Sequence, residues 1–128
     1  MPLFWTIDSK AQMFAAEAEG HVTLAEALEL LETMAAAKAL SYRKLIDGRR
    51  AVSAMLPHEI LELCVKIRSY HDRPDLGAVA IVGTAEQTVI FSRLLGALAA
   101  GNRPFKIFAT PRQARYWLAL LDRGPPPV

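Results

Sequence analysis

Helix-start signals recur along this chain, and they constrain its fold more than any other feature of the sequence. Thr23, Thr84 and Thr110 are each followed three residues later by Glu or Gln. This is the pattern of a capping box, in which each side chain accepts a hydrogen bond from the backbone amide of the other residue. Pro57 marks a fourth start, because proline is favoured at the first position of a helix. Apolar residues follow each start at helical spacing, so the pattern predicts four amphipathic helices.

Short apolar segments before and between these helices predict five strands. Three of the segments are too short for helices and are bounded by turn residues, which is typical of buried strands. The other two flank a turn at residues 8–11 and predict a hairpin, and we expect Gly20 to end the second of them. The predicted strands are Leu3–Asp8, Gln12–Glu19, Arg43–Asp47, Ala78–Gly83 and Phe105–Ala109.

The order of these elements predicts an α/β fold. After the N-terminal hairpin, strands alternate with helices, which is typical of a mostly parallel sheet with right-handed crossovers. The chain has 128 residues, of which 52% are hydrophobic, and this is enough for one core without disulfides or metals. We therefore expect a single domain over residues 1–124, with a mostly parallel five-stranded sheet and four helices, and a proline-rich tail at 125–128.

Composition and spacing argue against several classes of function. A net charge of +2 is too small to indicate nucleic acid binding. The single cysteine, Cys64, falls on the apolar stripe of the helix from Pro57 and is interpreted as a core residue. No histidines have metal-ligand spacing and no glycine-rich phosphate loop is present, so neither a metal nor another cofactor is expected. Residues 1–10 resemble neither a signal peptide nor a membrane span, so the expected location is the cytoplasm.

A binding site is expected where the parallel strands end. Such strands bring their carboxyl ends to one edge of the sheet, so the loops after the third, fourth and fifth strands should converge there. Helix starts carry partial positive charge, and together with Arg49 and Arg50 they would bind an anion such as a carboxylate or a phosphate. In the alternative interpretation, Thr84 and Thr110 only cap their own helices and the two arginines are merely solvated.

Asp47 opens the first of these loops, which is expected to run to Leu56. Asp-Gly pairs commonly shape turns, so Asp47 is interpreted as a turn residue that also positions the loop. Alternatively it holds Arg49 or Arg50, whose charge would favour the ionised carboxylate. The hydroxyl of Ser53, in the loop before the helix that starts at Pro57, and His58, in the first turn of that helix, complete the predicted surface. The predicted ligand-binding or partner-binding residues are Asp47, Arg49, Arg50, Ser53, His58, Thr84 and Thr110.

Phe4 and Trp5 are adjacent on the first strand, so their side chains point to opposite faces of the sheet. If the helices leave one face open, the aromatic residue on that face offers a protein contact or a homodimer interface. If helices cover both faces, both side chains join the core.

Three segments carry a resemblance to a known family. Residues 45–47 end a strand in an acid before a loop, and residues 105–110 are followed by the Ala-Arg-Tyr-Trp-Leu sequence of residues 114–118. Together with the element order, they resemble STAS domains, which occur in sulfate transporters and anti-sigma-factor antagonists. The resemblance covers residues 3–121 and is greatest to the stand-alone bacterial branch described as SpoIIAA-like or STAS/SEC14-like.

The resemblance implies a non-enzymatic regulatory module that binds a protein partner, such as a regulator or a kinase-type protein. Antagonists that act as phosphoswitches carry an Asp-Ser-Ser-Gly-like segment at the start of the helix after the central strand. The matching residues 55–58 here are Met-Leu-Pro-His, so the usual phosphorylated serine is missing. The SEC14-like label implies an alternative, a small carrier of a lipid or of another apolar or anionic ligand. A third option is a small enzyme that uses His58 and Asp47.

Overall fold

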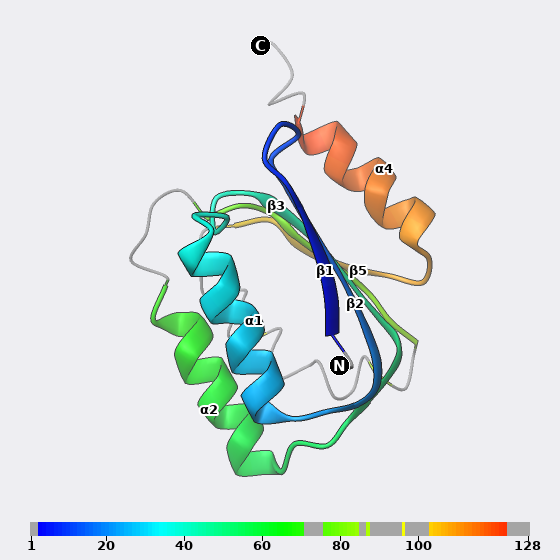
Figure 1. Cartoon of the computed structure of the whole chain (residues 1–128). Helices are drawn as coiled ribbons and strands as arrows, with labels where there is room; N and C mark the ends of the chain where they lie inside the picture. The colour runs from blue at the N-terminus through cyan, green and yellow to red at the C-terminus, as the bar shows by residue number, and fades with distance from the viewer. Residues whose placement is uncertain (1–2, 71–75, 85–86, 88–95, 97–102, 123–128) are drawn as a thin grey trace.

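Helices α1 and α2 lie on one face of a twisted sheet, and α4 lies on the other, in the computed structural model of the chain (Figure 1). The structure describes residues 3–70, 76–84, 87, 96 and 103–122. The strands are β1 (Leu3–Asp8), β2 (Met13–Val22), β3 (Arg43–Ser53), β4 (Val79–Val82) and β5 (Phe105–Phe108), and the helices are α1 (Leu24–Ala36), α2 (Pro57–Arg68) and α4 (Pro111–Asp122). The helix predicted after Thr84 lies outside the described residues except for Gln87 and Gly96, which are both helical, and the predicted tail at 125–128 also lies outside them.

The sheet is mixed. Its strand order is β1-β2-β3-β4-β5, with β1 antiparallel to β2 and the other three pairs parallel. The predicted hairpin is confirmed, and in its turn the Ala11 amide donates to Asp8 Oδ1 (2.9 Å). The sequence predicts a mostly parallel sheet with four helices. The antiparallel hairpin instead makes the sheet mixed, and the part of the chain that the structure describes forms three helices with assigned bounds.

Strands β2 and β3 both continue past the ends predicted for them. Gly20 does not end β2, and Asp47-Gly48 is not a turn, because both lie inside strands that pair with each other as far as Val22 and Ser53. Gly20 stays in the strand with a φ of +67°, a conformation that glycine adopts without a steric clash. Pairing between two long neighbouring strands satisfies backbone groups along their length, and this overrides the local preference for a turn.

The predicted helix starts of α1, α2 and α4 are confirmed. The Thr23 amide donates to Glu26 Oε1 (3.0 Å), and the Glu26 amide donates to Thr23 Oγ1 (3.3 Å). Pro57 is the first residue of α2. Thr110 precedes α4 and its Oγ1 accepts from the Gln113 amide (3.3 Å). Capping chemistry involves only neighbouring residues, so it locates these helices without knowledge of their packing.

Each face of the sheet has its own core. On one face, strand residues pack against α1 and α2; Phe14 is fully buried there, and Cys64 is confirmed as a core residue. On the other face, Leu45 and other residues of β3 and β4 pack against α4, whose Leu118 is fully buried. Helices therefore pack on both faces of the sheet.

The second face is only partly covered. Helix α4 packs on β3, β4 and β5, and the neighbouring part of that face, over β1 and β2, remains accessible. Trp5 packs against the core beneath α1, whereas Phe4 is 52% exposed. An exposed aromatic side chain of this kind offers a contact surface. None of the described helices is long and apolar enough to cross a membrane.

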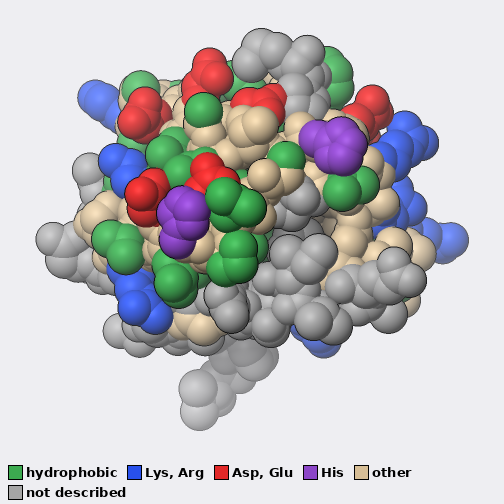
Figure 2. Space-filling model, turned by 90° about the horizontal axis from the view of Figure 1, so that it is seen from below, with side chains coloured by type: hydrophobic (Ala, Val, Ile, Leu, Met, Phe, Trp, Pro, Cys, Tyr) green, Lys and Arg blue, Asp and Glu red, His purple; other side chains and the backbone are tan. Residues whose placement is uncertain are grey.

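The end of the molecule at which α1 and α2 begin carries two exposed histidines (Figure 2). His21 lies near the end of β2, and His58 is in the first turn of α2. The space-filling view shows histidine side chains that lie apart from one another, with acidic side chains nearby (Figure 2). Within the described ranges, no three His, Cys, Asp or Glu side chains gather to hold a metal ion.

Candidate functional site

A bulge in β3 brings the two predicted arginines to one face of the sheet. Between Glu17 and Glu19, β2 advances two residues, while the paired stretch of β3 advances three, from Asp47 to Arg50. An extra residue reverses the alternation of side chains beyond it. Arg50 therefore lies on the same face as Asp47, and Arg49 lines the same small pocket as both of them. In a regular strand, Arg50 would instead point to the α1 side.

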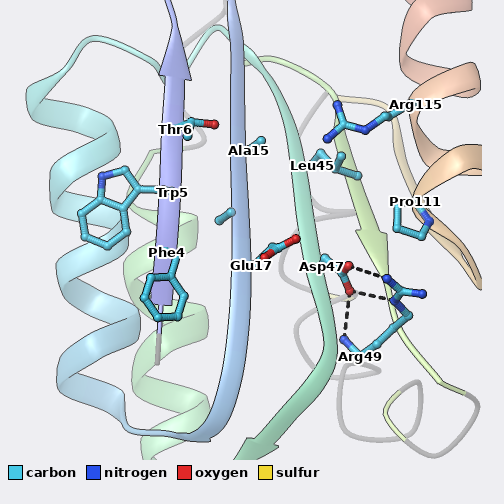
Figure 3. Close-up of a pocket in the computed structure, with 11 residues that line it drawn as sticks. Phe4, Trp5, Thr6, Ala15, Glu17, Leu45, Asp47, Arg49, Pro111 and Arg115 are labelled. Atoms are coloured by element: carbon cyan, nitrogen blue, oxygen red, sulfur yellow. Dashed lines mark hydrogen bonds and ion pairs between the residues drawn. The ribbon is translucent and has the colours of Figure 1, made fainter. Parts of the chain in front are cut away.

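Asp47 holds Arg49 with three hydrogen bonds (Figure 3). Asp47 Oδ1 accepts from the Arg49 backbone amide (3.2 Å) and from Arg49 Nε (3.0 Å), and Asp47 Oδ2 accepts from Arg49 Nη2 (2.9 Å). The Asp47 side chain is 14% exposed. The hydrogen bonds from Arg49 lower the pKa of Asp47 below its ordinary value. At neutral pH Asp47 is therefore an anion that orients Arg49, which confirms that its ionised form is favoured.

Arg50 is paired more loosely than Arg49. Its Nη1 lies 3.3 Å from Glu19 Oε1, and the two side chains are 77% and 46% exposed. Exposed pairs of this kind contribute little to stability, because water and salt screen them. Arg50 can therefore exchange Glu19 for another acidic group at small cost.

Gln87 joins the bulge to the start of the next helix. Its Oε1 accepts from the Thr84 amide (2.7 Å), and its own backbone amide donates to Thr84 Oγ1 (3.3 Å), which confirms the predicted capping box. Its Nε2 donates to the carbonyl of Gly48 and to that of Ala51, the latter at 3.0 Å. β4 pairs with β3 only as far as Asp47, so the Gln87 amide satisfies carbonyls that lie beyond the last pair with β4.

Replacing Gln87 with glutamate is expected to lower the free energy of unfolding by about 1–3 kcal/mol, because a carboxylate cannot donate to either β3 carbonyl. The change keeps the oxygen that accepts from Thr84. Gln113→Glu is the matched control, since Gln113 has the same capping position in α4 and is exposed, and an acid at a helix start is favourable. Urea denaturation of both variants measures the difference. Equal midpoints would show that the contact with β3 adds no stability.

Asp47 and Arg49 line a groove of about 300 Å³ on the α4 side of the sheet, which we call the Asp47 groove (Figure 3). The other lining residues come from β1, β2, β3 and α4 and are Phe4, Trp5, Thr6, Ala15, Ala16, Glu17, Leu45, Pro111 and Arg115. The groove places a half-exposed aromatic ring opposite fixed charges of both signs. A surface with these features suits contact with another protein.

Four of the seven predicted residues lie at or beside this groove. Asp47 and Arg49 line it, and Arg50 lies next to them in a small adjoining pocket. Thr110 immediately precedes Pro111, the groove residue with which α4 begins. The predicted convergence holds for the ends of β4 and β5, because Val82 and Phe108 pair with each other and Val82 pairs with Asp47. It is wrong for the third strand, because β3 continues past Asp47 to Ser53.

The other three predicted residues do not line the groove. Ser53 is the last residue of β3 and pairs with Val22, so the predicted loop from Asp47 to Leu56 is wrong over most of its length. His58 is exposed on α2, which packs on the opposite face of the sheet. Thr84 caps its own helix through Gln87, as the alternative interpretation predicts.

Nine of the eleven groove residues were missing from the predicted site, and those with aromatic or charged side chains on the groove face include Phe4, Glu17 and Arg115. Phe4 was considered separately, as a candidate contact residue of the first strand. The alternation that separates Phe4 from Trp5 also holds along β2, and extending it would have placed Glu17 on the Phe4 face. No local signal could have placed Arg115, because its position depends on where α4 crosses the sheet.

Comparisons with known proteins agree with this fold. No family model matches the chain, and no curated protein matches its sequence. An uncharacterised protein of the DUF3478 family with a SpoIIAA-like fold, from Shewanella loihica PV-4, is 22% identical over 91% of this chain and 93% of that one, with a TM-score of 0.60. An anti-sigma factor antagonist from Mycobacterium paratuberculosis is 15% identical over 91% of this chain and 94% of that one, with a TM-score of 0.54. Both likenesses span nearly the whole chain, which therefore has the SpoIIAA-like fold that the sequence resemblance predicts.

Proposed function

We propose that this protein is a non-enzymatic, cytoplasmic module that regulates a protein partner by binding it at the Asp47 groove. The observation that carries the proposal is the combination of a half-exposed Phe4 with the oriented Asp47–Arg49 pair in one open groove. Aromatic and arginine side chains dominate the free energy of many protein interfaces. The likeness to an anti-sigma factor antagonist supports a regulatory role by analogy of fold.

The charges of the groove define the partner that it suits. Two acids, Glu17 and Asp47, and two bases, Arg49 and Arg115, line the groove, so a partner with both acidic and basic groups would be complementary to it. Arg49 is already oriented by Asp47, so less side-chain entropy is lost on binding than for a freely rotating arginine. The groove volume is at the lower end of the range of about 300–1,000 Å³ for small-molecule sites, which favours a protein segment lying across it.

The same geometry supports a role without catalysis. A general base needs a pKa near the working pH, and the hydrogen bonds from Arg49 lower that of Asp47. His58, the other residue of the enzyme hypothesis, lies on α2, across the sheet from the groove. The two groups therefore do not share a site.

We infer that binding is not switched by a phosphoserine at the start of α2. Residues 55–58 contain no serine or threonine, and Leu56 occupies the cap position before Pro57. Ser53 lies in β3, paired with Val22, and not at a helix start, where amides would stabilise a phosphate.

The double variant Arg49→Ala with Arg50→Ala is expected to weaken partner binding by roughly tenfold or more, as the loss of a hot-spot arginine does, with little change in melting temperature, as for most surface substitutions. Lys10→Ala with Arg68→Ala is the control, because it removes the same charge from exposed positions outside the groove. Immobilised wild type and both variants are compared for the proteins that they retain from a lysate of the source organism, and isothermal titration then measures the affinity.

The result that supports the proposal is a protein retained by wild type and control but lost from the groove variant. Equal retention by all three forms would contradict it. Light scattering of the purified chain is measured first, because a homodimer that the groove variant dissociates would make a second copy the partner. A large loss of stability in the groove variant would show that the arginines are structural.

The alternative function, a small carrier of an apolar or anionic ligand, is favoured by a separate observation. An apolar cavity lies beneath α1 and α2, on the opposite side of the sheet from the Asp47 groove.

A further inference from the structure

The cavity beneath α1 and α2 has a volume of about 160 Å³. Its described walls are almost wholly apolar. They include Leu30 and Met34 of α1, Leu63 and Ile67 of α2, and Ile46 and Ile81 of the sheet. An apolar cavity of this kind excludes water and favours an apolar occupant.

Two cationic side chains reach this apolar wall. Lys44 is 2% exposed, and its Nζ donates to the carbonyls of Leu40 (2.6 Å) and Tyr42 (2.8 Å). Through these hydrogen bonds, Lys44 fixes the backbone of the segment before β3. Arg103 differs, because its Nε is buried and has no hydrogen-bond partner in the part of the chain that the structure describes.

Arg103 is a partly buried cation, and among the described residues no charged group neutralises it. Loss of water around its guanidinium lowers the pKa of Arg103, and no described charge offsets that effect. A buried donor that stays unpaired costs stability. An unsatisfied buried group calls for an explanation, and a bound ion that supplies the missing acceptor is one of them.

We infer that this cavity binds a small apolar carboxylate, with its hydrocarbon part among the walls of α1, α2 and the sheet and its carboxylate on the Arg103 guanidinium. Arginine matches a carboxylate in geometry and charge. The inference deepens the carrier alternative and rests on it; it does not depend on the Asp47 groove.

The volume of the cavity limits the size of the ligand. An apolar protein cavity of about 150 Å³ holds one benzene molecule, and sites for drug-sized ligands start at about 300 Å³. The occupant is therefore the size of an aromatic acid or a short-chain acid, and a long-chain acyl lipid is too large.

The test uses the full chain and three probes: benzoate, its uncharged analogue toluene, and palmitate. Binding is followed by chemical-shift changes of methyl groups in the cavity walls and by isothermal titration. We expect benzoate and toluene to shift the signals of Leu30 and Ile67, and palmitate to bind more weakly than benzoate. Ala27→Leu, which fills the cavity from α1, is expected to reduce binding of both small probes.

Arg103→Met is expected to weaken the binding of benzoate by roughly tenfold or more, because hydrogen bonds to a charged group are lost. The binding of toluene should not change. Arg112→Met is the control, since Arg112 is exposed on α4 and the net charge changes equally. Without ligand, Arg103→Met should also raise the melting temperature, because a desolvated cation is removed. A purely structural arginine would give the opposite shift.

The outcomes test three claims separately: that the cavity binds a ligand, that the ligand is a carboxylate, and that the ligand is small. If neither small probe shifts the cavity signals, both the carrier alternative and the carboxylate inference fail. If toluene binds and benzoate does not, or if Arg103→Met weakens both probes equally, the cavity is a site but the carboxylate ligand is wrong. If palmitate binds more tightly than benzoate, the size limit is wrong. None of these results bears on the Arg49 and Arg50 variant, so the regulatory proposal fails or stands independently.

Discussion

Replacing Leu118 with alanine is expected to lower the free energy of unfolding by about 2–5 kcal/mol, the range for large-to-small changes in a core. Leu118 is fully buried between α4 and the sheet, in a cluster with Leu45 and Val82. Its loss removes apolar contacts and leaves a cavity that a four-residue strand such as β4 cannot easily close. Denaturant titration, with the midpoint and slope fitted together, measures the change.

Leu120→Ala is the matched control for this prediction. The chemical change is the same and lies in the same helix, but Leu120 is 43% exposed, so its truncation should cost about 0.5 kcal/mol or less. Because α4 supplies Pro111 and Arg115 to the Asp47 groove, Leu118→Ala should also weaken partner binding, whereas Leu120→Ala should not. Equal losses of stability from the two variants would show that α4 is not docked through Leu118.

Replacing Gly77 with alanine is expected to destabilise the protein by about 1–3 kcal/mol or more, as overpacking does. A Cβ at this position would overlap the carbonyl oxygens of Ser41 and Tyr42. Neither partner moves away easily, because the Gly77 amide donates to the Leu40 carbonyl (3.0 Å) and the Tyr42 carbonyl accepts from Lys44 Nζ. The melting temperature and the denaturation midpoint measure the loss.

Gly96→Ala provides the control of opposite sign. Gly96 is helical, and an added Cβ there meets no described residue within 4 Å. Alanine at such a helical position should stabilise the protein by about 0.5–1 kcal/mol, because glycine loses more backbone entropy on folding. If both alanine variants were equally stable, the close approach at Gly77 would be refuted.

The helix starts show what local chemistry alone can predict. The bonds between Thr23 and Glu26 and between Thr84 and Gln87 join residues three apart, so their formation requires no tertiary contact. Pro57 acts through its own ring geometry. The alternation that sends Phe4 and Trp5 to opposite faces is equally local. These features could be predicted from the sequence with their residue numbers.

Strand lengths could not be predicted in this way. Gly20 and the Asp47-Gly48 pair carry strong local signals for a turn, yet β2 and β3 pair through both of them. A turn preference is a small free-energy difference for a few residues, whereas a continuous ladder satisfies many backbone groups together. The partners of that ladder are about 30 residues apart, so a local pattern does not reveal it.

The candidate site likewise contains residues that the sequence predicts and residues that it does not. Asp47 and Arg49 are two residues apart in the sequence, and one interpretation from sequence already pairs them, as the structure confirms. Glu17 and Arg115 reach the same groove from distant parts of the chain. His58 is the converse case, because it is near Asp47 in sequence but lies across the sheet from it.

By itself the sequence determined where the helices of the described chain begin, that Phe4 and Trp5 lie on opposite faces of the sheet, and that Asp47 stays ionised beside an arginine, because each depends on interactions among near neighbours. Tertiary structure alone decided that the Asp47-to-Arg50 segment is a bulged strand with both arginines on one face. It also decided that Phe4, Glu17 and Arg115 complete the groove and that, among the described residues, Arg103 Nε has no hydrogen-bond partner beside an apolar cavity. Those features depend on strand register and helix docking, which are set by contacts summed over the whole core.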